Sequence, residues 1–280
     1  MPLMGKAVGV KQRHLIRPVQ PARSAFAGYR FPPEVILIAV QWYLRYGLSY
    51  RDLEELLAER GIEVDHVTLF RWVQRFTPML IDAARPCRHR VGGHWFVDET
   101  YVKVSGFWRY VYRAIDQYGQ VIDVFLSKKR DLKAATQFFS SVITAHGQPT
   151  EITTDRAHAL VRVITELLPA ALHDTTQYAN NRVEADHGRL KARLRPMRGL
   201  KRDRTASIAI RGHAFIQNLR RGHYELGVDA RVGAENVIRV PHAASLYSWM
   251  RPPSLSVLRS RASSGSPIDA GPVSTGSGAC

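Results

Sequence analysis

The chain has 280 residues, of which 45% are hydrophobic and 9% aromatic. This composition provides the core of one large domain or two smaller ones, and it excludes a chain that is disordered throughout. The formal net charge is +16 and the pI is about 10.3. Such an excess predicts a polyanionic partner, most commonly a nucleic acid. Two cysteines exclude a disulfide framework, and the apolar runs are too short to cross a bilayer, so we expect a cytoplasmic protein with no membrane partner.

The N-terminal part of the chain divides into two segments. Residues 1–30 are basic and rich in proline and glycine, and we expect a flexible arm there. Residues 31–83 predict three short helices, the first beginning at a proline pair. Ser49 and Asp65 suit the N-caps of the second and third helices, and we expect the third helix to end at Pro78.

The tight turn between the second and third of these helices favours a helix-turn-helix DNA-binding domain. The third helix would then be the recognition helix and would present Thr68, Arg71 and Gln74 or Arg75 to DNA. A three-helix bundle that mediates only protein contacts is the alternative, because helix triplets alone do not distinguish the two.

After a basic linker at residues 84–93, the pattern becomes that of strands alternating with helices. Its order, β-β-β-α-β-α-β-α, predicts an α/β fold: a mixed sheet flanked by helices, as in the ribonuclease H type, over residues 94–227. Residues 228–280 lose periodicity and become rich in Ser, Gly, Pro and Ala, which is typical of a disordered tail. The expected strands are 94–104, 107–115, 120–126, 151–154 and 172–176, and the expected helices are 131–145, 157–168, 182–193 and 207–221.

Three acids in this region suit phosphodiester chemistry. Two divalent cations, held by carboxylates, can activate a nucleophile and stabilise a leaving oxygen across one phosphorus. Mg²⁺ prefers such oxygen ligands. Asp98 lies within the first strand, Asp155 directly follows the fourth, and Glu184 lies early on a helix.

Each of these acids also has an ordinary structural explanation. Asp98 can face solvent in an alternating strand, and its neighbour Glu99 falls on the other face, so strand parity selects neither. Asp155 can cap the following helix. Glu184 can complement the dipole of its own helix.

Basic residues are concentrated between Arg182 and Arg221, where twelve Lys and Arg face three acids and contribute +9 of the +16. A solvated helix face is the alternative, but the shortage of acids favours phosphate contacts. The predicted DNA-binding residues of this run are Arg189, Arg193, Arg195, Arg198, Lys201, Arg202 and Arg204. Four aromatic residues at strand spacing are interpreted as core and sheet-face residues rather than base-stacking platforms: Trp95, Trp108, Tyr110 and Tyr112.

Three segments resemble the motifs of the DD-E insertion-sequence transposases of the insertion sequence six group. They are VDETYVKV from Val97, TDRA from Thr154 and NNRVEADHGRLK from Asn180. Residues 28–31 and 42–49 are similar to the family's helix-turn-helix region, and the resemblance covers roughly residues 26–227. It implies a ribonuclease H-like catalytic domain in which Asp98, Asp155 and Glu184 are the catalytic and metal-binding residues and Lys191 contacts DNA.

The resemblance also implies the reaction: cleavage at the ends of a DNA element and transfer of the 3′ hydroxyl into target DNA, by a replicative route that forms cointegrates. Two Mg²⁺ ions are expected, with Mn²⁺ as a substitute. The implied partners are terminal inverted repeats, target DNA and further copies of the chain, at least a dimer. Two alternatives stay open: a plain metal nuclease, and a catalytically inactive, transposase-derived DNA-binding regulator. The second is motivated by His158 and Leu160, which depart from the family's proline and tyrosine after the second aspartate.

Overall fold

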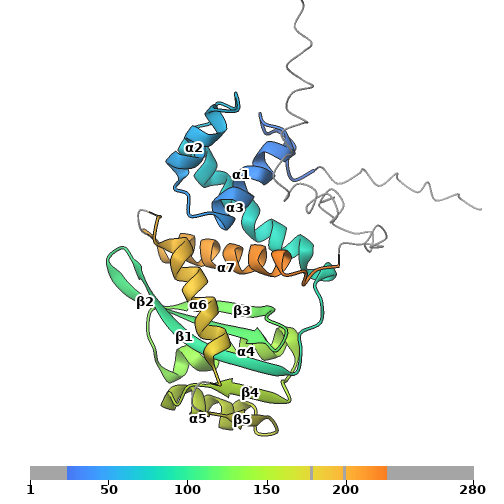
Figure 1. Cartoon of the computed structure of the whole chain (residues 1–280), viewed down its shortest axis with the longest axis vertical. Helices are drawn as coiled ribbons and strands as arrows, with labels where there is room; N and C mark the ends of the chain where they lie inside the picture. Colours follow the sequence, from blue (N-terminus) through green and yellow to red (C-terminus); the bar gives the residue numbers. More distant parts are fainter. Residues whose placement is uncertain (1–23, 177–178, 198–199, 226–280) are drawn as a thin grey trace, which may run out of the picture.

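The computed structural model describes residues 24–176, 179–197 and 200–225, and shows a group of three helices above a five-stranded sheet (Figure 1). Most of the expected arm at 1–30 and all of the expected tail at 228–280 lie outside the described residues. Within the described part of the chain, no helix is both long and apolar enough to span a membrane.

The three N-terminal helices form where capping residues predict them. Ser49 and Asp52 exchange hydrogen bonds between side chain and backbone, which closes a capping box at the start of the second helix. The Asp65 carboxylate accepts hydrogen bonds from the backbone N–H groups of Val67 and Thr68 at the start of the third. The helices are α1 (Pro33–Arg45), α2 (Tyr50–Ala58) and α3 (His66–Ala84).

The sequence predicted that the third helix ends at Pro78, but the helix continues to Ala84. Proline removes one helical hydrogen bond and crowds the preceding turn, which normally favours a helix end. Here the turn after Pro78 carries Met79, Leu80 and Ile81, which pack against the core of the helical group. Burial of these side chains outweighs the local cost, and a short 3-10 turn (η1, Arg85–Cys87) follows.

The sheet has the order β3-β2-β1-β4-β5. The central strand β1 is antiparallel to β2 and parallel to β4, and β4 is parallel to β5. This mixed sheet is that of the ribonuclease H type and confirms the expected fold class. The strands are β1 (His94–Val104), β2 (Phe107–Asp116), β3 (Val121–Ser127), β4 (Glu151–Thr154) and β5 (Leu172–Asp174).

Helices cover both faces of the sheet, because β1 buries side chains alternately on its two sides. Trp95 and Val97 pack in the core on the side of α4 and α5. Phe96 and Val102 pack in the core on the side of α6 and α7. These helices are α4 (Leu132–His146), α5 (His158–Leu167), α6 (Asn181–Leu194) and α7 (Asp203–Arg220).

Helix α7 belongs to two cores at once and lies between the helical group and the sheet (Figure 1). Its residues Phe215, Ile216 and Leu219 pack with α1 and α3, whereas Ile210 and Ala214 pack on the sheet side. The two units are therefore joined by a packed helix as well as by residues 84–93. We propose that the domain boundary falls within residues 84–93, with α7 shared between the units.

Candidate active site

Two aspartates lie next to each other at the end of the parallel β1–β4 ladder. The ladder pairs His94–Val97 with Glu151–Thr154, residue for residue. The next residue of each strand is an aspartate, Asp98 in β1 and Asp155 directly after β4. Since functional side chains collect at the carboxyl ends of parallel strands, this register places two predicted site residues at one point of the sheet.

A third carboxylate joins them. One oxygen each of Asp98, Glu99 and Asp155 lies within 4.8 Å of the others. The sequence left open whether Asp98 or Glu99 belongs to the site, and the structure includes both. The Glu99 side chain is only 3% exposed, its Oε2 has no hydrogen-bond partner, and burial raises the pKa of its carboxyl.

Arg130, in the loop between β3 and α4, is the cation that contacts this acidic group. Its Nε donates to Glu99 Oε1, and its Nη2 lies 3.7 Å from Asp155 Oδ2. Its charge lowers the pKa of the Glu99 carboxyl and so opposes the effect of burial. Sequence reasoning missed Arg130, because only the fold brings this loop beside the end of β4.

Helix α6 crosses β1 at the same place. Asn180 Nδ2 donates to Val97 O at 3.0 Å, and His187 Nδ1 lies 3.4 Å from Asp98 Oδ2. Glu184 lies between these two contacts in the sequence of the helix and is exposed. Among the residues that the structure describes, Glu184 is not part of the 4.8 Å acidic group. The structure thus brings together Asp98 and Asp155 and places Glu184 on the helix that flanks them.

The position of α6 is fixed by a buried ion pair. Arg113, directly opposite Asp98 in the β1–β2 ladder, donates from Nε to Asp186 Oδ2 at 2.9 Å, and both side chains are 0% exposed. Arg221 and Gln217 of the α7 region also bind Asp186. Burial alone would raise the pKa of Asp186, but Arg113 and Arg221 hold it below its usual range. This network ties β2, α6 and α7 together behind the acidic group.

The acidic group fits a divalent cation. Its carboxylate oxygens are the ligands that Mg²⁺ prefers, and few protein ligands suffice because the ion keeps several waters. Three clustered carboxylates also repel one another unless a cation is shared among them. Arg130 contacts two of them, and the partnerless Oε2 of Glu99 leaves a further acceptor inside the group.

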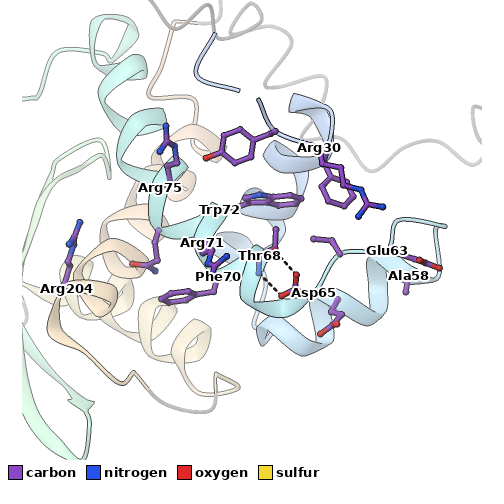
Figure 2. A pocket seen from close by; sticks show the side chains of 15 residues that line it. Arg30, Ala58, Glu63, Asp65, Thr68, Phe70, Arg71, Trp72, Arg75 and Arg204 are labelled. Atoms are coloured by element: carbon purple, nitrogen blue, oxygen red, sulfur yellow. Dashed lines mark hydrogen bonds between the residues drawn. The ribbon is translucent and has the colours of Figure 1, made fainter. Parts of the chain in front are cut away.

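A second polar surface lies on the helical group. Thr68, Arg71 and Arg75 have the i, i+3 and i+7 spacing that puts side chains on one face of α3. They line an open pocket of about 1100 Å³, together with Arg30 before α1 and Arg204 of α7 (Figure 2). The Thr68 hydroxyl donates to Asp65 Oδ2 at 2.6 Å, so this side chain is held in place by the helix cap.

The predicted basic run separates into three kinds of residue. Arg193 is only 6% exposed: its guanidinium lies 4.9 Å from the Tyr43 ring centre, and its Nε donates to Leu44 O at 3.3 Å. This corrects the prediction that Arg193 contacts DNA, because its guanidinium is buried between α6 and α1. Arg189 is exposed but is paired with Asp186. Arg198 lies outside the described residues, and Lys191, Arg195, Lys201 and Arg202 are exposed.

Comparison with known proteins found a matching family model and similar transposases. The sequence model of a family described as a DDE domain matches residues 92–223. The chain is 41% identical over 169 residues to the transposase for the insertion sequence-like element IS431mec of Staphylococcus aureus, covering 59% of this chain and 75% of that protein. The same identity and coverage hold for the transposase for insertion sequence element IS257 in transposon Tn4003 of Staphylococcus aureus.

Solved structures of retroviral proteins show more distant likeness. The HTLV-2 integrase catalytic core domain in complex with magnesium is 23% identical, with a TM-score of 0.30, over 36% of this chain and 68% of that one. The simian T-cell lymphotropic virus intasome in complex with PP2A regulatory subunit B56 gamma is 17% identical, with a TM-score of 0.35, over 68% of this chain and 65% of that one.

The sheet topology and the match to the DDE domain define a polynucleotidyl transferase of the DD-E class. Identity to the staphylococcal proteins then gives the family. The chain belongs to the DD-E insertion-sequence transposases of the insertion sequence six group, enzymes of DNA transposition.

Proposed function

We propose that this transposase cuts DNA at the ends of its element and joins the freed 3′ hydroxyls to target DNA, with Asp98, Asp155 and Glu184 as catalytic metal ligands. The observation that carries the proposal is the register of β1 and β4, which sets Asp98 beside Asp155 with their oxygens within 4.8 Å. Glu184 is proposed as the third ligand because α6, which carries it, contacts β1 at Val97 and Asp98.

The proposed cofactor is a pair of Mg²⁺ ions, for which Mn²⁺ would substitute. Such ions polarise a phosphoryl oxygen and lower the pKa of an attacking water or hydroxyl. The protein's own part is to hold and orient the ligands. His187 lies beside Asp98 and would orient its carboxylate, while Arg130 binds Glu99 and lies beside Asp155.

DNA binding is proposed at two surfaces. Thr68, Arg71 and Arg75 of α3 would read the terminal inverted repeats, as recognition helices read base edges in the major groove. The exposed cations around α6 would hold the phosphate backbone near the acidic group, because they release counterions when they bind it. The proposed phosphate contacts are Arg189, Lys191, Arg195, Arg198, Lys201 and Arg202.

The proposed assembly is a homo-oligomer, at least a dimer, because two element ends must be held together for joining. The proposed route is replicative and leaves the two replicons fused as a cointegrate. The reaction would take place in the cytoplasm, where the donor and target DNA lie.

The test uses the purified chain, Mg²⁺ and DNA that carries the inverted repeats flanking its gene. Asp98→Asn is expected to lose cleavage and joining by more than about 100-fold, because loss of an outer partner of a metal ligand already costs 10- to 100-fold. Binding to the repeats should be retained. Glu166→Gln is the matched control, since Glu166 is an exposed acid of α5 paired with Arg162, outside the acidic group.

Joining by Asp98→Asn at the wild-type rate would refute the metal-ligand assignment. Wild-type protein that binds the repeats but never cuts them would instead identify a transposase-derived regulator. Hydrolysis without any joined product would identify a nuclease.

A further inference from the structure

The far end of the β1–β2 hairpin carries two exposed aromatic rings. Tyr101 is 55% and Trp108 50% exposed, and their rings meet edge to face with centroids 5.0 Å apart. We call these two residues the hairpin platform. The expectation that Trp108 belongs to the core is wrong, whereas Trp95 and Tyr112 are buried as expected.

The hairpin platform is exposed because the neighbouring strands stop short of it. Strand β4 pairs with β1 only as far as Val97, and β3 pairs with β2 only from Tyr110 onward. The end of the hairpin therefore projects beyond the rest of the sheet (Figure 1). Neither of the two sheet-face cores includes Tyr101 or Trp108.

A lysine ammonium group lies over each ring of the hairpin platform. Lys103 Nζ lies 4.8 Å from the centre of the Trp108 ring, and Lys191 Nζ lies 4.7 Å from the centre of the Tyr101 ring. Lys191 comes from α6, the helix that flanks the acidic group. Aromatic faces for bases beside cations for phosphates are the combination that sites for single-stranded nucleic acid use.

The hairpin platform also lies close to the acidic group. Tyr101 follows Glu99 by two residues on the same face of β1, which separates them by about 7 Å along the strand. That is about two nucleotides of a stacked strand at a rise of 3.4 Å each. Lys191 follows Glu184 by seven residues, so both lie on one side of α6.

We propose that the hairpin platform stacks on an unpaired base of the DNA strand held at the acidic group, next to the bond that is cut. The occupant is a nucleobase rather than a protein side chain, because both rings are bordered by lysines that would repel a basic second copy of this chain and attract phosphate. The proposal rests on the proposed function and adds a contact that keeps the cut end of the DNA open.

The test measures base stacking directly, in metal-free buffer so that no strand is cut. The probe is a duplex of the element end with a short single-stranded extension that contains 2-aminopurine, whose fluorescence falls when it stacks. Wild-type protein is expected to quench this fluorescence and to bind the extended duplex about tenfold tighter than a blunt one, given the usual strength of base–aromatic stacking.

The Tyr101→Ala, Trp108→Ala double variant should lose the quenching and most of the tenfold preference, while its affinity for blunt duplex is unchanged. Trp108→Phe with Tyr101 intact should keep most of the effect, because an aromatic face remains. Phe107→Ala is the matched control: Phe107 is 67% exposed on the same hairpin, but it alternates to the other side of the strand. Thermal unfolding should be unchanged in all variants, since the replaced side chains are exposed.

Full quenching and full preference in the double variant would overturn the proposal. So would a change in sedimentation of the free protein with quenching unaltered, which would make the hairpin platform a contact between copies. Asp98→Asn separates this proposal from the preceding one, because it should keep the quenching and lose only cleavage. If Asp98→Asn still cuts DNA, the metal-ligand assignment fails while the stacking measurement still stands.

Discussion

Asp98 and Asp155 occupy neighbouring register positions on two parallel strands, each one residue beyond the last pair of the β1–β4 ladder. Most of a domain separates them in the sequence, including a hairpin, a third strand and a helix. Their proximity follows from the topology alone, because β4 adds to the free edge of β1 and runs in the same direction. The flanking helix α6 then closes the site from one side through His187.

Two variants test whether Glu184 or Glu99 is the third metal ligand. Glu184→Gln is expected to reduce Mg²⁺-dependent cleavage by more than about 100-fold, as expected for a direct ligand. Glu99→Gln should reduce it less, because Glu99 Oε1 is engaged with Arg130. Cleavage is measured against Mg²⁺ concentration for both variants. Near-normal cleavage by Glu184→Gln, together with loss in Glu99→Gln, would move the third ligand to Glu99.

The buried pair of Asp186 and Arg113 should control stability. Asp186→Asn leaves the fully buried Arg113 guanidinium without its counter-charge, so a loss of about 3–5 kcal/mol in the free energy of unfolding is expected. Asp203→Asn is the control, since Asp203 is paired with Arg109 but is partly exposed, and should cost less than about 1 kcal/mol. Equal losses for the two variants in urea unfolding would contradict this account.

Stability should also depend on pH through His213. Burial, and then the charge of Arg113, lower the pKa of His213 from 6.5 to about 4. The unfolded chain therefore binds a proton that the folded chain excludes, and stability is lost as pH falls from about 6.5 towards 4. This single group should cost about 2 kcal/mol between pH 7 and pH 5.

Urea unfolding at several pH values tests this dependence with His213→Gln. The variant should show a shallower fall between pH 7 and pH 5, although His146, whose pKa is also lowered to about 4 by burial, keeps part of the slope. His158→Gln, at an exposed ring, serves as the control and should follow the wild-type curve. An unchanged slope in His213→Gln would show that His213 is not the source.

Two helical glycines should respond in opposite directions to alanine. A Cβ at Gly212 of α7 would lie 2.6 Å from Leu44 Cδ2 and 2.7 Å from Thr77 Cγ2, so Gly212→Ala should cost about 1–3 kcal/mol of overpacking. A Cβ at Gly188 of α6 meets nothing within 4 Å, so Gly188→Ala should stabilise the chain by up to about 1 kcal/mol. The same sign for both in urea unfolding would contradict the close approach of α7 to α1 and α3.

The sequence predicted best the elements whose residue pattern is visible within a few neighbouring positions. The alternation of β1 and the four residues of β4 match the structure, because hairpins and short buried strands carry their own turn residues and periodicity. The continuation of α3 past Pro78 could not be predicted, since it depends on packing against a distant part of the chain.

The candidate site was also predicted only in part from local sequence patterns. Asp98 and Asp155 were found from motifs, but the inclusion of Glu99 and the contact of Arg130 required the fold to place a loop beside the end of β4. The sequence assigns Arg193 to DNA because it lies in a run of cations with few acids to balance it. Its burial against Tyr43 comes from the helical group, which no local pattern reveals.

The shared helix α7 has a consequence for where the DNA is cut. One helix of 18 residues is built into both cores, so α3 and the sheet that carries the acidic group pack against the same helix. The distance along the DNA between the recognised repeat and the cut bond would then be set by the packing of α7. Lengthening the connection at residues 84–93 would leave that measure unaltered, whereas a kink introduced into α7 would shift the scissile position.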